Sequence, residues 1–301
     1  MQTITIEAPA KINLTLDIKG KRSDGYHELE TVMHQVDLFD RITLEPRTSG
    51  IEIATNSSFI PLGPENLAYK AALMILSKCQ PGVGVKIFIE KNIPVGAGLA
   101  GGSTDAAAVL AGINHLYNCR FSRQQLLEMA AAIGSDVAFC LFGEYFEPRP
   151  AELLSRGATA MARGRGELLE SLATRIIPYI LIVKPDFDLS TAEVYSELDL
   201  SAVEEFPDTG NFLQVWNKGD IINISVYMAN VLESVSIRKK PEIGIIKSRL
   251  IKMGALTALM SGSGPSVFAI FPDNEIACRA YQAFKNEYQE VYLLSSYKRG
   301  D

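Results

Sequence analysis

The sequence is poor in cysteine and in long apolar runs. Its four cysteines show no CxxC pair and no spacing typical of metal ligands. We therefore expect Cys79, Cys119, Cys140 and Cys278 to be buried, reduced thiols. No uninterrupted apolar run approaches about 18 residues, and no charged-then-apolar signal segment opens the sequence. These absences predict no membrane partner and a cytoplasmic protein.

An excess of positive charge is also absent. The 29 lysines and arginines are outnumbered by 35 aspartates and glutamates, which leaves a net charge of −6 and a pI near 5.3. We therefore expect no nucleic-acid partner. An anionic small molecule remains compatible, because a local site can be basic within an acidic protein. With 301 residues, 47% of them hydrophobic, the chain can bury a full core in one large or two medium domains.

The order of predicted elements favours an α+β fold. Strand pairs precede helices, without the steady alternation of a doubly wound sheet. Ser122 and Gln125 have the spacing of a capping box, which predicts a helix from there to Gly134. Other strands are expected at 2–8 and 11–18 (joined near Pro9), 40–45, 51–54, 83–90, 178–184, 256–260, 266–271 and 290–297, and other helices at 66–78, 104–117, 220–235, 242–253 and 274–288.

The segment PVGAGLAGGST, residues 94–104, carries the clearest functional signal. Its glycines, at 96, 98, 101 and 102, stand between a predicted strand and a predicted helix. Glycines let backbone N–H groups approach a ligand closely, and the start of a helix attracts anions. A plain tight turn is the alternative, but the density of glycines favours a phosphate-binding loop.

Three widespread phosphate loops do not fit this segment. Its glycines match G-x-G-x-x-G, but the next segment is predicted to be a helix, whereas a dinucleotide site needs a second strand that ends in an acidic residue. No Gly-Lys-Ser/Thr closes a Walker loop. The lysine strand, HRD and DFG motifs of protein kinases are missing as well. A nucleoside triphosphate loop of another type remains.

Two charged residues in apolar surroundings are candidate catalytic groups. Asp136 lies within GSDVAFCLFG and Lys11 within APAKINLTL. A buried carboxylate needs a role or a partner, and a nearby lysine would keep it ionised for proton abstraction. The alternatives are an N-cap for Asp136 and a solvent-facing strand lysine for Lys11. The late turn SGSGPS, 261–266, is either a second anion-binding turn or an ordinary hairpin turn.

Taken together, these segments resemble the GHMP small-molecule kinases over nearly the whole chain. The resemblance rests on APAKINLTLDIKGKRSDGYHELETVM (8–33), ENLAYKAA (65–72), IPVGAGLAGGSTDAA (93–107), GSDVAFCL (134–141), GRGE (164–167) and SGSGPSVF (261–268). It implies a two-lobed α+β fold, with an ATP-binding and catalytic domain at 1–168 and a substrate-binding domain at 169–301. ATP and substrate would meet in the cleft between them, in a monomer or weak homodimer.

The DGYHEL segment is similar to that of superfamily members that phosphorylate an alcohol carrying a cytidine diphosphate group, in the non-mevalonate route to isoprenoid precursors. Asp136 would then take a proton from the substrate's 2-hydroxyl, and Lys11 would orient that carboxylate. ATP with Mg²⁺ would be held by Pro94, Val95, Gly96, Ala97, Gly98, Leu99, Ala100, Gly101, Gly102, Ser103, Thr104, Asn66, Leu67 and Lys91. The substrate would be held by Asn13, Tyr26, His27, Thr191, Tyr195, Gly262, Ser263 and Gly264. The ligands of Mg²⁺ are not identifiable from the sequence.

One segment departs from the family pattern. About fifteen extra residues near 144–158 follow GSDVAFCLFG, and we expect a surface excursion that costs little loop entropy and leaves the fold intact. Two alternative functions stay open. One is a kinase for mevalonate, homoserine or a sugar, against which DGYHEL argues. The other is a nucleotide-binding regulator without catalysis, against which the retention of Lys11 and Asp136 argues.

Overall fold

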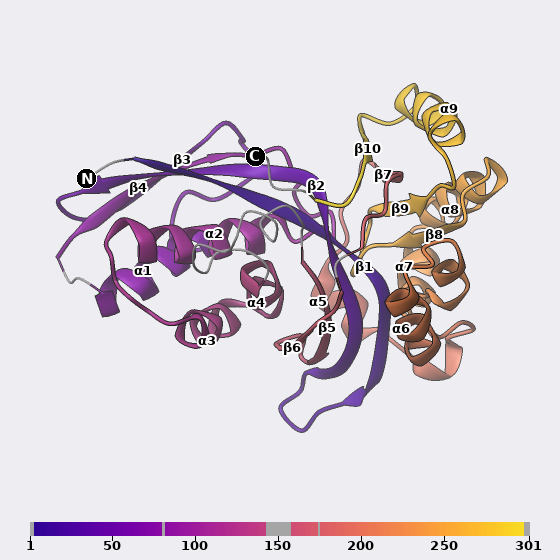
Figure 1. The fold of residues 1–301 in the computed structure, drawn as a ribbon, viewed down its shortest axis with the longest axis horizontal. Coiled ribbons are helices and arrows are strands. Elements are labelled where there is room, and N and C mark those ends of the chain that lie inside the picture. The colour runs from indigo at the N-terminus through magenta and orange to yellow at the C-terminus, as the bar shows by residue number, and fades with distance from the viewer. Residues whose placement is uncertain (1–2, 80–81, 143–157, 174, 298–301) are drawn as a thin grey trace.

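The computed structural model describes residues 3–79, 82–142, 158–173 and 175–297, and it contains two β-sheets (Figure 1). The larger sheet has the strand order β3-β4-β2-β5-β6, with β1 paired to β2, and the smaller sheet has the order β10-β7-β9-β8. The predicted α+β class is confirmed. The strands are β1 (Ile4–Lys21), β2 (His27–Arg47), β3 (Ile51–Thr55), β4 (Gly84–Glu90), β5 (Thr159–Gly164), β6 (Leu168–Ser171), β7 (Ile180–Lys184), β8 (Thr257–Met260), β9 (Val267–Ile270) and β10 (Glu290–Leu294).

The molecule has two parts, one built on the larger sheet and one on the smaller sheet. A long antiparallel hairpin, β1 with β2, links them (Figure 1). The prediction of separate strands at 2–8 and 11–18 is wrong, because Pro9 lies inside one continuous strand. A register shift between Pro9 and Lys11 accommodates a residue that has no N–H to donate. The backbone N–H of Leu16, in the same strand, donates to the carbonyl of Ala229 at 2.9 Å. The hairpin thus contributes to both parts.

Four helices lie together on one side of the larger sheet, where α1, α2 and α4 contact its strands and α3 packs on the other three helices (Figure 1). They are α1 (Leu67–Cys79), α2 (Gly101–Leu116), α3 (Arg123–Ile133) and α4 (Ser135–Phe142). The capping box of Ser122 and Gln125 is confirmed at the start of α3. At Gly112 of α2, an added Cβ would stand 2.4 Å from a methyl group of Leu44, so the helix packs very closely on the sheet. This packing sets where the glycine-rich start of α2 lies.

The prediction of four reduced thiols is wrong for two of the cysteines. Cys79, at the end of α1, and Cys119, shortly after α2, form a disulfide, with their Cα atoms 5.1 Å apart. The two helices pack side by side, so cysteines 40 residues apart in the sequence become neighbours. Cys140 is a buried free thiol, as predicted, and Cys278 is free but only partly buried.

Helices also pack on the smaller sheet, where the predicted helix at 220–235 is wrong (Figure 1). That stretch holds a 3₁₀ turn, η3 (Asn223–Tyr227), and only the start of α7. Between them, the backbone at 229–231 pairs with Leu16 of β1, and the side chain of Asn230 accepts from the N–H of Leu232 at 3.0 Å. These contacts compete with helical hydrogen bonds. The remaining helices are α5 (Thr191–Ser196), α6 (Thr209–Lys218), α7 (Glu233–Lys239), α8 (Glu242–Lys252) and α9 (Asn274–Lys285), with a 3₁₀ turn, η2 (Leu200–Ala202); α5 and α6 were not predicted.

Two predicted features concern the middle of the chain. The extra segment at 144–158 lies, except for Ala158, outside the described residues. The proposed domain boundary at 168 coincides with the start of β6, which pairs with β5 in the larger sheet. Within the described ranges, no helix is both long and apolar enough to cross a membrane.

Candidate active site

A cavity of about 400 Å³ lies between the two parts of the molecule. On one side it is lined by β1, β2, the glycine-rich segment and the starts of α1 and α4. On the other side it is lined by α5 and the turn at 262–264. Most of the predicted site residues line this cavity. The exceptions are Leu99, Thr104, Tyr26 and His27.

The glycine loop, residues 94–100, leads directly into α2. Gly96, Gly98 and Ala100 have φ values of 66°, 75° and 60°, in the left-handed region that glycine adopts most easily. Ala100 is the N-cap of α2 and makes no side-chain capping bond. The first N–H groups of α2 therefore face the cavity without a capping side chain, which is the usual arrangement for binding an anion. Leu99 and Thr104 are instead buried in the protein.

Gly98 is the point at which the glycine loop meets the late turn. A Cβ added to Gly98 would stand 2.2 Å from the carbonyl oxygen of Ser261, and the hydroxyl of Ser261 donates to the carbonyl of Gly98 at 3.0 Å. The amide of Asn230 holds the turn from behind, donating to the carbonyls of Met260 at 2.8 Å and Gly262 at 2.7 Å. The turn is the hairpin connection between β8 and β9 and also lines the cavity.

Lys11 and Asp136 meet at this cavity. The ammonium of Lys11 lies 3.4 Å from the carboxylate of Asp136 and donates to the side-chain oxygen of Asn13 at 2.8 Å. The Lys11 side chain is only 4% exposed, so the alternative of a solvent-facing strand lysine is wrong. The Asp136 side chain is 41% exposed and lies in the first turn of α4. The arrangement leaves a carboxylate open to a ligand and a buried cation behind it.

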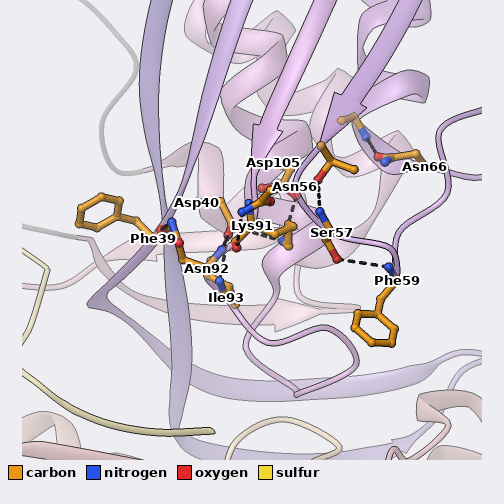
Figure 2. Close-up of polar contacts among 12 residues, drawn as sticks. Phe39, Asp40, Asn56, Ser57, Phe59, Asn66, Lys91, Asn92, Ile93 and Asp105 are labelled. Carbon is orange, nitrogen blue, oxygen red and sulfur yellow. Dashed lines mark hydrogen bonds and ion pairs between the residues drawn. The ribbon is translucent and has the colours of Figure 1, made fainter. Parts of the chain in front are cut away.

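The three predicted ATP-site residues outside segment 94–104 have different environments. Asn66 accepts from the N–H of Ala68 at 2.8 Å and donates to the carbonyl of Pro61 at 2.8 Å, so it caps α1 and fixes the preceding loop. Leu67 lines the cavity as the first residue of α1. Lys91 also lines it, but its ammonium is bound by the carboxylates of Asp40 and Asp105 (Figure 2).

The predicted substrate residues Thr191, Tyr195 and Ser263 line the cavity, whereas Tyr26 and His27 lie outside its lining. The hydroxyls of Thr191 and Ser263 are 2.8 Å apart, which ties α5 to the late turn. The ring centroids of Tyr195 and His27 lie 5.4 Å apart. Tyr26, the residue before His27, is 57% exposed. Burial raises the pKa of Tyr195, and the charge of Asp136 adds to the effect. Burial and the charge of Lys21 lower the pKa of His27, so its ring is neutral near pH 7.

Sequence reasoning missed Asp40 and Asp105. Both are buried, and both bind the ammonium of Lys91. A signal was present for Asp105, which is a lone charge in the apolar run that follows the glycine-rich segment. Asp40 gave no such signal, because it stands among other charged residues at the centre of β2.

Comparison with known proteins agrees with this geometry. Residues 66–144 match the family of GHMP kinases N terminal domains, and residues 212–290 match the GHMP kinases C terminal family. A 4-diphosphocytidyl-2-C-methyl-D-erythritol kinase from Syntrophomonas wolfei is 62% identical over 98% of this chain and 99% of its own length. A protein of the same name from Alkaliphilus metalliredigens is 42% identical over 99% of this chain and 98% of its own length.

Solved structures give the same result. A crystal structure of a 4-(cytidine 5'-diphospho)-2C-methyl-D-erythritol kinase superposes with a TM-score of 0.80 and 33% identity, over 99% of this chain and 100% of that one. A homoserine kinase from Cytophaga hutchinsonii, 20% identical, shares the fold, with a TM-score of 0.72 over 99% of this chain and 96% of its own. With this fold, a glycine loop at a helix start and relatives that match from end to end, the chain belongs to the GHMP kinases and is an ATP-dependent small-molecule kinase.

Proposed function

We propose that this kinase transfers the γ-phosphoryl group of ATP to the 2-hydroxyl of 4-diphosphocytidyl-2-C-methyl-D-erythritol, a step in the synthesis of isoprenoid precursors. The choice of substrate is supported by two relatives, 62% and 42% identical to this chain, that are named as kinases of this compound. The observation that carries the mechanism is the ion pair of Lys11 and Asp136, 3.4 Å apart in the cavity that the glycine loop lines.

Asp136 is the proposed general base. Its partly exposed carboxylate accepts the proton of the substrate hydroxyl as the oxygen attacks phosphorus. The ammonium of Lys11 stabilises the ionised carboxylate and the charge that develops on the attacking oxygen. Asn13 holds the ammonium in place at 2.8 Å, and its own amide donates to the hydroxyl of Thr31 at 2.9 Å.

The glycine loop and the start of α2 are the proposed phosphate site. Phosphoryl transfer depends mainly on positioning and on neutralised phosphate charge, both of which backbone N–H groups can supply. The described residues include no group of three or more His, Cys, Asp or Glu side chains that could hold a metal ion. Mg²⁺ fits such a site when most of its ligands are phosphate oxygens and water, and it would then neutralise phosphate charge.

The proposed cytosine site is the pair of Tyr195 and His27, with Tyr26 and Thr191 nearby. Cytosine is a flat base with hydrogen-bond donors and acceptors on its edge. The Tyr195 ring can stack on its face, and the neutral imidazole of His27 can donate or accept a hydrogen bond. Tyr26 and His27 do not line the cavity itself, so they would contact the part of the substrate that projects from its mouth.

An assay of ADP release, run with ATP and Mg²⁺, tests the proposed substrate. The assay compares 4-diphosphocytidyl-2-C-methyl-D-erythritol with mevalonate, homoserine and galactose at equal concentrations. We expect turnover with the cytidine compound alone. Turnover with only one of the other alcohols would retain the kinase but refute the proposed cytosine site.

Replacement of Asp136 by Asn tests the proposed base. Because the amide cannot accept the proton, we expect kcat to fall by about 100-fold or more while ATP binding is nearly unchanged. Glu128→Gln, which neutralises an exposed carboxylate on α3, is the matched control and should retain wild-type kcat. An Asp136→Asn variant with nearly wild-type kcat would remove Asp136 from the proposed mechanism.

A further inference from the structure

Lys91, Asp40 and Asp105 form a cluster of charged side chains, none of them more than 5% exposed (Figure 2). Lys91 follows β4, Asp40 is in β2, and Asp105 is on the second turn of α2. The ammonium of Lys91 binds one carboxylate oxygen of Asp40 and lies 3.1 Å from a carboxylate oxygen of Asp105. The Lys91 side chain is 5% exposed, so solvent contributes little to holding it.

Each carboxylate is tied to a different end of the glycine loop. The second oxygen of Asp40 accepts the backbone N–H groups of Asn92 at 2.6 Å and Ile93 at 2.9 Å, the residues immediately before Pro94. Asp105 belongs to α2, whose first residue, Gly101, follows the loop. A Cβ added to Gly101 would stand 2.9 Å from the ammonium of Lys91, so that cation lies against the helix start. One ammonium therefore joins both ends of the loop.

We propose that Asp40, Lys91 and Asp105 form a clamp that sets the spacing of the two ends of the phosphate loop, so that Lys91 acts on ATP by positioning the loop. This inference deepens the proposed ATP site and rests on it. Backbone N–H groups bind phosphate only when they converge on it, and displacements near 1 Å have large effects on such contacts. The backbone of Lys91 is itself fixed, since its N–H donates to the side-chain oxygen of Asn56 at 2.8 Å.

The charges of the clamp are held in a buried environment. Burial opposes the ammonium of Lys91, but the two carboxylates raise its pKa, so it stays charged. Burial raises the pKa of Asp105 well above its usual range, with Asp40 adding to the rise against the opposing effect of Lys91. The second oxygen of Asp105 has no hydrogen-bond partner among the described residues. Asp105 can be removed without leaving Lys91 unpaired, because Asp40 remains, whereas removal of Asp40 would also leave the N–H groups of Asn92 and Ile93 without their acceptor.

Replacement of Asp105 by Ala is the test that follows. It cuts the link between Lys91 and α2 and leaves the pair of Asp40 and Lys91 intact, so we expect the fold to be retained. We expect the Kd for a non-hydrolysable ATP analogue with Mg²⁺, measured by calorimetry, to rise about tenfold or more. The KM for the alcohol substrate should change less than twofold. Asp105→Asn keeps an oxygen that can accept from Lys91 and should restore a Kd close to that of the wild type.

Val109→Ala is the control for general destabilisation, because Val109 is buried on the same helix one turn further from the loop. It should lower Tm without changing the Kd of the analogue. The clamp is refuted if Asp105→Ala binds the analogue within twofold of the wild type, or if Val109→Ala weakens binding equally. Wild-type protein that does not bind the analogue would refute the ATP site itself, and the clamp with it. Binding of the analogue without turnover of the cytidine compound would leave the clamp supported and refute only the proposed substrate.

Discussion

Replacement of Gly98 by Ala should separate the two loops that enclose the cavity. Gly98 has a φ of 75°, and its added methyl group would stand 2.2 Å from the carbonyl oxygen of Ser261. Ordinary contact begins at 3.4 Å, so one backbone must move by about 1 Å. The hydrogen bond from the Ser261 hydroxyl to the Gly98 carbonyl, 3.0 Å long, would be lost or stretched by that movement.

The magnitude has two parts that can be separated. A non-glycine residue in the left-handed region costs about 1–2 kcal/mol. Overpacking against a backbone adds about 1–3 kcal/mol, and a displacement of about 1 Å at a reacting group can lower the rate by about 100-fold. Gly50 also has a φ of 75°, but an added Cβ there meets nothing within 4 Å. Gly50→Ala therefore measures the conformational cost alone.

Urea unfolding and ADP-release kinetics on the two variants test this reasoning. We expect Gly50→Ala to lose about 1 kcal/mol of stability and to keep its kcat/KM. Gly98→Ala should lose about 2–5 kcal/mol and at least about tenfold in kcat/KM. The reasoning is wrong if Gly98→Ala matches Gly50→Ala in stability and keeps kcat/KM within twofold of the wild type.

Three further predictions concern other sites. Burial lowers the pKa of His34 from 6.5 to about 4, so the unfolded chain takes up a proton in this range and the folded chain does not. This difference should lower the free energy of unfolding by about 3 kcal/mol as the pH drops from 6.5 to 4. Urea unfolding at a series of pH values should show a weaker pH dependence for His34→Gln, and an unchanged dependence would contradict the prediction. Tyr195→Ala should raise the KM for the cytidine compound about tenfold and spare the KM for ATP, whereas a rise for ATP alone would misplace the base site. Because Cys79 and Cys119 are bonded, denatured, unreduced protein should show two reactive thiols of four, and four would exclude the disulfide.

Local patterns predicted several elements and the glycine-rich loop before α2. The capping box before α3, the strand at β4 and the four glycines at the start of α2 depend on neighbouring residues, so they can be recognised in sequence. The same is true of the isolated charges Lys11 and Asp136, whose burial in apolar segments indicated a partner without naming it. Their separation of 3.4 Å became evident only when β1 and α4 packed together.

Features that depend on distant segments were not predictable in this way. The stretch at 220–235 has helical composition, but pairing of 229–231 with β1 takes its backbone out of the helix. Cys79 and Cys119 look unrelated until α1 and α2 lie side by side.

What the sequence determined by itself was the chemistry available: a glycine-rich segment before a helix, a carboxylate and a lysine, in an order typical of one kinase superfamily. Only the tertiary structure decided which groups surround Lys91. In the sequence it is one of many lysines, and its two partners lie 51 and 14 residues away. Folding places it between two buried carboxylates, because the end of β4, the middle of β2 and the start of α2 converge there. The interaction of a buried charge depends on which groups surround it in space, and that arrangement is set by long-range packing.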